Sequence, residues 1–176
     1  MRKLLLIFLF CATGLAFGNN LNTYNLPELR KKYLAASQDS EEGKSFYALM
    51  SSYKEKEPVV MAYKAVSEAT MAKYVWNPYQ KLKHLKQSAA IFDEAVQLDN
   101  QNPEIHFLRF TVEHYVPRYL NLSNHVAEDK KIIMQSLKAH PNSGISPEWA
   151  RTMRDFMLTK DHCTEEEKKV LRNVNI

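Results

Sequence analysis

Glycine and cysteine are both scarce in this chain, which has only four glycines and two cysteines among its 176 residues. The glycines are not grouped into a loop that could cradle the phosphates of a nucleotide. No Gly-x-Ser-x-Gly segment marks the nucleophile of a hydrolase, and none of the six histidines belongs to a His-Glu-x-x-His zinc motif. No stretch alternates between apolar and polar residues as a strand does. The sequence therefore specifies no reaction and no cofactor, and it favours a non-catalytic helical protein.

The first eighteen residues have the organisation of a secretory signal peptide. Arg2 and Lys3 give a positive start, residues 4–15 are apolar, and the small residues Ala16 and Gly18 occupy the positions that precede a cleavage site. We expect cleavage after Gly18 and a periplasmic or secreted location for the remaining chain.

Two alternatives for this segment stay open. Cys11 could be the lipid-modified first residue of a membrane-anchored lipoprotein, although Phe10 is large where lipoprotein processing requires a small residue. The segment could also remain as an uncleaved anchor, although its apolar run is short for a membrane span. Apart from such an anchor, membrane contact is expected only if Cys11 is lipidated.

Residues 19–176 are expected to form a single helical domain. Removing 18 residues from 176 leaves 158, and removing Arg2 and Lys3 leaves 22 basic against 20 acidic residues, so the net charge falls from +4 to +2. So small an excess gives no reason to expect a nucleic-acid partner. Cys163 would be the single remaining cysteine, which excludes an internal disulfide.

Apolar periodicity and helix-capping residues predict eight helices. Apolar residues from Leu82 to Val96 recur at steps of three and four, which places them on one helix face. Asn or Ser precedes proline at Pro78, Pro103 and Pro147, as at a helix start. Thr164 and Glu167 form a capping box. The predicted helices are Pro27 to Ala36, Ser40 to Lys54, Pro58 to Tyr74, Pro78 to Leu98, Pro103 to Val116, Ser123 to Ala139, Pro147 to Leu158 and Glu165 to Asn173.

The turns between these helices indicate a repeating all-α architecture. Hairpins end near Pro58, Asn100 and Pro141, so the pattern recurs loosely every forty or so residues. Short links make neighbouring helices antiparallel, and stacked pairs bury faces that one pair would leave exposed. We expect helix hairpins stacked as a short α-solenoid or an irregular bundle.

One segment resembles a tetratricopeptide repeat. Ser88, Phe92, Ala95, Val96, Leu98 and Asp99, followed by Asn100-Gln101-Asn102, are similar to the second helix and closing turn of that repeat, and residues 132–142 resemble a second such ending. The period is longer than the usual repeat, and the tryptophan and glycine of its first helix are absent. The Phe107-Leu108-Arg109 and Val116-Pro117-Arg118 segments also resemble those of small exported envelope proteins of the Bacteroidetes bacteria. The resemblance to the tetratricopeptide repeat implies stacked helix pairs that bind another protein, whereas the resemblance to the envelope proteins implies no known activity.

Arg109 is the charged residue that the sequence singles out. It lies in a helix that is apolar nearly all round, so we expect it to be buried and paired with a carboxylate, either Glu113 or an acid of the preceding helix such as Glu94. Alternatively, it could receive the carboxylate of a ligand. Pro117 should end this helix and direct Arg118 and Tyr119 into the following turn. The candidate binding residues are Arg109, Glu113, Arg118 and Tyr119.

Three further groups of residues have weaker interpretations. His106, His114 and Glu113 could join a metal site only if another helix contributed a ligand. Lys81, Lys83 and Lys86, with His84, form either a solvated helix face or a patch for an acidic partner or anionic lipid. Trp76 and Tyr79 flank an inter-helix turn, where we expect them to plug the structure rather than to form an exposed anchor.

These observations lead to three functional hypotheses. The first is an exported, non-catalytic scaffold or adaptor of the cell envelope that binds another envelope or secreted protein. The alternative is a carrier of a small ligand or lipid, with an inter-helix cavity lined by residues such as Met61, Met71 and Phe107. The third is an enzyme whose site is assembled from distant residues, which would require histidines and acids to converge.

Overall fold

The computed structural model describes residues 24–176, so the predicted signal peptide and Cys11 lie outside the described residues. The described part is all-α and contains no strand, as expected from the sequence. The elements are α1 (Leu26–Ala36), α2 (Ser40–Ser51), α3 (Pro58–Tyr74), α4 (Pro78–Leu98), α5 (Pro103–Glu113), the 3-10 turn η1 (Arg118–Leu120), α6 (Val126–Ala139), α7 (Pro147–Leu158) and α8 (Glu165–Arg172).

The helices begin where the capping residues predict. The side chains of Asn77, Asn102 and Ser146 accept hydrogen bonds from backbone N–H groups in the first turns of α4, α5 and α7, each of which has proline at its start. Thr164 and Glu167 form the predicted capping box of α8. These caps position the helix starts independently of tertiary packing.

Three predicted helix ends are wrong by about one turn. Helix α2 ends at Ser51 rather than at Lys54, and α5 ends at Glu113 rather than at Val116. In both cases the chain then tightens, because the backbone N–H groups of residues 52 and 53, and of residues 115 and 116, bond three residues back instead of four. Helix α6 begins at Val126 rather than at Ser123, and the backbone N–H of His125, just before it, donates to a side chain of α5 described below.

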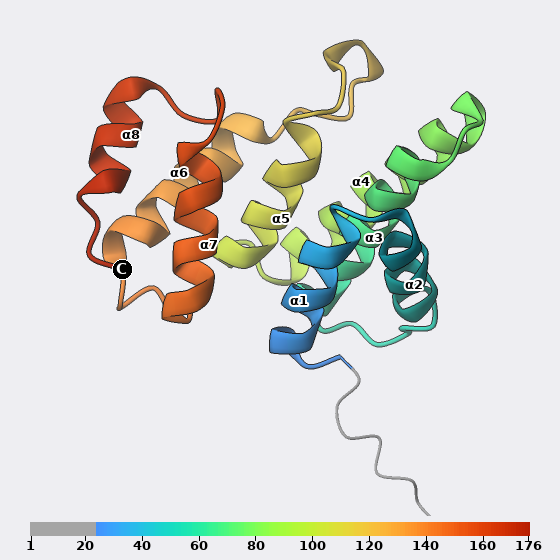
Figure 1. The fold of residues 1–176 in the computed structure, drawn as a ribbon, viewed down its shortest axis with the longest axis horizontal. Helices are drawn as coiled ribbons and strands as arrows, with labels where there is room; N and C mark the ends of the chain where they lie inside the picture. The colour runs from blue at the N-terminus through green and yellow to red at the C-terminus, as the bar shows by residue number, and fades with distance from the viewer. Residues whose placement is uncertain (1–23) are drawn as a thin grey trace, which may run out of the picture.

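The helices stack as antiparallel hairpins in chain order. Consecutive helices contact one another throughout, and α3 also contacts α1 and α5, so it lies at the centre of the N-terminal half (Figure 1). The C-terminal half is looser, with α8 lying against α6 and α7 at the end of the array. This arrangement confirms the expected bundle or short solenoid.

Successive links between helices alternate between the two ends of the array (Figure 1). The α1–α2, α3–α4, α5–α6 and α7–α8 links are together at the upper end in that view, whereas the described chain starts at the lower end. We call the upper end the α3–α4 end. The candidate binding residues of the α5–α6 link and the aromatic residues of the α3–α4 link therefore share one end of the molecule.

The α3–α4 hairpin projects beyond its neighbours because its helices are longer. With a rise of about 1.5 Å per residue, the 21 residues of α4 span about 31 Å, while the 11 residues of α5 span about 16 Å. Trp76, in the link, is consequently 96% exposed and Tyr79 is 77% exposed. The expectation that these aromatic residues plug the structure is wrong, because no helix extends far enough to cover them.

No helix within residues 24–176 combines the length and the apolar character that crossing a membrane would require.

Candidate functional site

Helix α5 carries the buried ionic contact that joins it to α6. Arg109 is 3% exposed, and its Nη2 and Nε donate to the two carboxylate oxygens of Asp129 at 2.7 and 3.0 Å. His106 Nδ1 lies 2.6 Å from Asp129 Oδ1, and its Nε2 lies 3.1 Å from the backbone oxygen of Asn100. Both ring nitrogens thus face oxygen atoms of neighbouring residues.

Asp129 balances the charge of Arg109. Burial opposes the positive charge, but the hydrogen bonds and charge of Asp129 outweigh it and raise the pKa of Arg109 above its ordinary value. The partner expected from sequence, Glu113 or Glu94, is wrong. Glu94 forms a surface ion pair with Lys56, and Glu113 binds elsewhere. Arg109 therefore locks two helices together and is not free to receive a ligand carboxylate.

A second buried contact, which the sequence did not suggest, joins α5 to the N-terminal helices. Arg30 donates from Nε and Nη2 to the two oxygens of Glu104 at 2.9 and 2.6 Å, and Tyr63 donates its hydroxyl to the same carboxylate at 2.6 Å. Burial and the charge of Glu104 raise the pKa of Tyr63 well above its ordinary value. Arg30 also lies over the ring of Trp149 in α7, 5.2 Å from its centre.

Glu113 holds the base of the link between α5 and α6. One carboxylate oxygen accepts the backbone N–H of His125 at 2.8 Å, and the other lies 2.8 Å from Nδ1 of the same residue. His125 is the N-cap residue of α6, and its own side chain does not cap the helix. Glu113 thus satisfies the backbone N–H of the N-cap residue, and the two ends of the long link are clamped together.

The clamped link presents Arg118 and Tyr119 to solvent. The loop rises beyond the ends of α5 and α6 in Figure 1, and its outer part is the turn η1, which closes at Asn121 in the left-handed conformation. Tyr119 is 81% exposed and Arg118 is also exposed. Of the four candidate binding residues, these two lie on the surface, whereas Arg109 and Glu113 lie inside and support them.

A cluster of aromatic and titratable side chains lies beside this loop, between the end of α5 and the α7–α8 link. His162 is 2% exposed and stacks on Phe156 with ring centres 4.3 Å apart. Its Nδ1 donates to the backbone oxygen of Phe156 at 2.8 Å, which leaves Nε2 to accept the hydroxyl proton of Tyr115 at 2.7 Å. Lys160 lies 3.3 Å from the same hydroxyl.

The surroundings of His162 keep its ring neutral. Burial lowers the pKa of His162 below its ordinary value of 6.5, and the nearby His114 lowers it further. His114 itself approaches the exposed carboxylate of Asp161 at 3.4 Å. Two histidines and an acid do converge here, as the enzyme hypothesis requires. Both nitrogens of His162 are already bonded and its ring is covered, and one of these bonds holds the hydroxyl of Tyr115.

The proposed metal ligands are separated in the structure. His106 bonds to Asp129, His114 approaches Asp161, and Glu113 bonds to His125. Within residues 24–176, no group of three or more histidine, cysteine or acidic side chains is arranged to hold a metal ion.

An open groove lies between α6 and α8 at the C-terminal end of the array. Its volume is about 410 Å³, and its lining includes Met134, Val170 and the lysines 130, 131 and 138. Met61 and Phe107, which were expected to line a carrier cavity, instead belong to the hydrophobic core, where Phe107 packs edge-on against Trp149. The groove is therefore a site that the sequence did not indicate.

Comparison of the chain with protein-family models, curated proteins and solved structures finds no match. The resemblance to tetratricopeptide repeats accordingly rests on the residues named above.

Proposed function

We propose that this protein is an exported, non-catalytic interaction module of the cell envelope, which binds another envelope or secreted protein through the α5–α6 loop. The observation that carries the proposal is the combination of an exposed Tyr119 and Arg118 with a loop base fixed by Glu113. Tyrosine and arginine, with tryptophan, are the residue types that most often dominate the energy of protein interfaces. A loop held in one conformation loses less entropy when a partner binds.

The interior of the protein supports a scaffold role. The charged side chains of α5 that a ligand could have used are engaged in contacts between helices. Each of these contacts fixes the position of α5, from which the loop projects. The buried polar residues thus have a structural function that leaves the loop surface for recognition.

Site-specific photo-crosslinking tests this proposal. A photoreactive amino acid at position 119 should form a covalent adduct with one protein in intact cells, and Arg118→Ser should weaken that adduct. The matched control places the same group at position 55, which is exposed in the α2–α3 link at the opposite end. If position 119 gives no adduct, or the same set of adducts as position 55, the proposal is refuted.

The alternative, a carrier of a small ligand, has the groove between α6 and α8 in its favour. Met134 and Val170 offer apolar contact and the neighbouring lysines offer positive charge, which together suit a small anionic amphiphile. Met134→Glu should abolish the binding of a fluorescent fatty acid to the purified protein. Absence of saturable binding to the unaltered protein would remove this alternative.

A further inference from the structure

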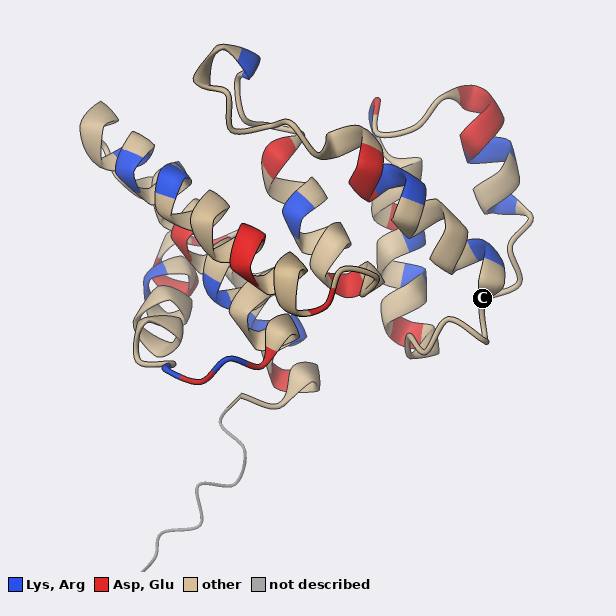
Figure 2. Ribbon diagram, turned by 180° about the vertical axis from the view of Figure 1, so that it is seen from behind, with Lys and Arg blue, Asp and Glu red and all other residues tan. Residues whose placement is uncertain are grey.

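The tip of the α3–α4 hairpin is rich in lysine and contains no acidic residue. Between Glu68 and Asp93 the chain has four lysines and neither aspartate nor glutamate. Figure 2 shows the outer turns of this hairpin, at the upper left, with basic and no acidic segments. The lysines are Lys73, Lys81, Lys83 and Lys86. Such a tip carries a local positive potential that the small net charge of the whole protein does not reveal.

Exposed aromatic side chains accompany these lysines. Trp76 and Tyr79, the most exposed tryptophan and one of the most exposed tyrosines among the described residues, lie at the end of the hairpin. Large amphipathic rings are favoured at the boundary between the polar headgroups and the acyl chains of a bilayer. Positive charges near them are attracted to anionic headgroups.

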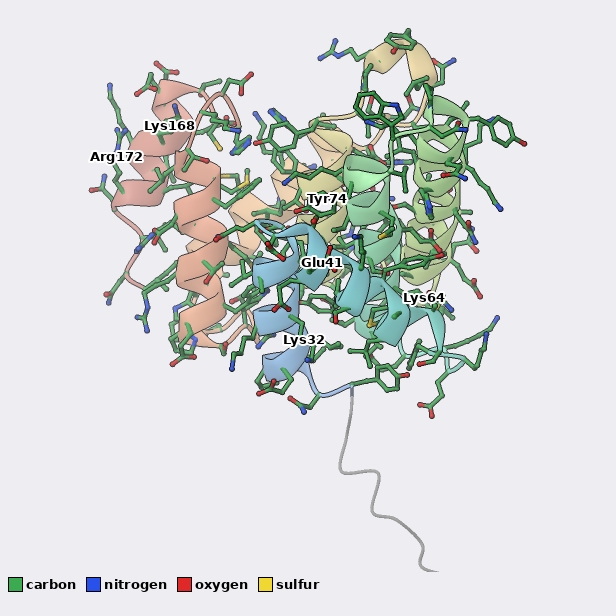
Figure 3. All side chains as sticks on the ribbon, turned by 45° about the vertical axis from the view of Figure 1, so that its right-hand side comes forward. Lys32, Glu41, Lys64, Tyr74, Lys168 and Arg172 are labelled. Carbon is green, nitrogen blue, oxygen red and sulfur yellow. The ribbon has the colours of Figure 1, made fainter. Side chains whose placement is uncertain are left out.

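The tip is held rigidly at its base. The hydroxyl of Tyr74 donates to the backbone oxygen of Ala36 at 3.0 Å, and Lys73 donates to that of Ser37 at 2.7 Å. Figure 3 labels Tyr74 and Glu41 at this junction of α3 with the start of α2. Gly43 permits the close packing, since a Cβ there would lie 2.7 Å from the Tyr74 ring. The residues beyond Tyr74 therefore project as a fixed feature.

We propose that the tip formed by Trp76, Tyr79, Lys81, Lys83 and Lys86 docks on the surface of an anionic phospholipid bilayer. The side chains of these three lysines make no ion pair or hydrogen bond with other residues of the described chain, so their charges are available. The charge is of one sign, and the aromatic residues lie at the outermost point. That arrangement fits an extended anionic layer into which the rings insert at shallow depth.

This inference goes beyond the proposed protein docking and uses different residues. The hairpin tip and the α5–α6 loop lie at the same end of the molecule (Figure 1). A partner bound at Tyr119 would therefore be held near the bilayer. Failure of lipid binding would leave the crosslinking result at position 119 unaffected. Failure of crosslinking would likewise leave the lipid-binding result unaffected.

Tryptophan fluorescence measures the docking directly. The two tryptophans of the chain are Trp76, at the tip, and Trp149, which is 3% exposed in the core. Titration with vesicles containing phosphatidylglycerol should shift the emission of Trp76 to shorter wavelength, and Trp76→Phe should abolish the shift. Vesicles of phosphatidylcholine alone should bind much more weakly, and added salt should weaken binding to the anionic vesicles.

Charge variants separate docking at the tip from non-specific attraction. Each lysine close to an anionic surface contributes about fivefold to partitioning, so Lys81→Ser with Lys83→Ser should weaken binding about twenty-five-fold. The matched control is Lys31→Ser with Lys32→Ser, which removes the same charge from exposed positions of α1 and should change binding less than threefold.

Several results would overturn the proposal. These are an absence of binding to anionic vesicles, equal binding to phosphatidylcholine, and equal effects of the two double variants. A further outcome combines two results: soluble polyglutamate binds and this binding depends on the lysines of the tip, while vesicles cause no wavelength shift. That outcome would indicate an acidic protein as the occupant instead.

Discussion

Replacing Asp129 by asparagine removes one negative charge from the buried contact between α5 and α6 and leaves Arg109 and His106 in place. Within residues 24–176, the only other acid at ion-pair distance from Arg109 is Glu128, at 3.7 Å, whose side chain is 62% exposed. Asparagine offers one acceptor where aspartate offers two. In either orientation its amide group would face a donor, because Asp129 Oδ1 bonds to His106 and Arg109 while Oδ2 bonds to Arg109.

The burial of Arg109 and Asp129 determines how much stability each substitution removes. Breaking a buried ion pair by removing one partner costs about 3–5 kcal/mol, since a charge is left without compensation in the interior. Arg109→Met should cost less, about 1–3 kcal/mol, because methionine fills part of the volume and His106 still bonds to the Asp129 carboxylate. Glu128→Gln should cost less than about 0.5 kcal/mol, since Glu128 is exposed.

Urea denaturation at neutral pH, followed by circular dichroism, measures all three free energies of unfolding. The expected order of loss is Asp129→Asn, then Arg109→Met, then Glu128→Gln. A loss below about 1 kcal/mol for Asp129→Asn would refute the conclusion that this contact locks α5 to α6.

Three further predictions concern other parts of the chain. Mass spectrometry of exported protein should give an N-terminus at Asn19 without added acyl mass; a diacylglyceryl group on Cys11 would show that the lipoprotein alternative is correct. Cys163 is buried, and burial raises the pKa of its thiol. In the folded protein this thiol should therefore react with a thiol reagent more slowly than in denaturant, by a factor on the order of a hundred or more. Equal rates would contradict its burial. The folded state holds His162 neutral, so its contribution to stability is complete above about pH 6.5 and is lost as the pH falls below that value. Urea titrations at several pH values should therefore show a smaller acid-induced loss of stability in His162→Gln than in the unaltered protein, and identical losses would contradict this assignment.

Much of the fold could be predicted from the sequence because local signals specify it. A proline that follows Asn or Ser fixes the start of α4, α5 and α7 without any distant contact. Apolar spacing then identifies the buried face of each helix. Helix ends were less certain, because nothing in the residues after Ser51 or Glu113 forces the backbone to turn there.

The partners of buried charges could not be predicted in the same way. A residue four positions along the helix, such as Glu113, is the neighbour that sequence reasoning favours for Arg109. The structure instead supplies Asp129, 20 residues away, from the next helix. One signal for it was present, since Asp129 lies four and eight residues before the buried Ile133 and Leu137, on the same helix face.

The orientation of Trp76 shows a different limit. Clustered aromatic residues at a turn are compatible with a covered or an exposed position, and local sequence does not distinguish the two. The lengths of the helices decide it, because α4 extends beyond the helices that could have covered its first turns. Comparing predicted helix lengths would therefore have indicated exposure.

Binding of the protein identified by crosslinking at position 119 tests the central claim most directly. Its dissociation constant should rise at least tenfold for Tyr119→Ala, a loss of about 1.4 kcal/mol or more, which is typical of an interface residue that carries binding energy. Tyr79→Ala, which removes an equally exposed ring from the neighbouring hairpin, should change it less than about twofold. Equal effects of the two variants, or no effect of Tyr119→Ala, would contradict docking through the α5–α6 loop.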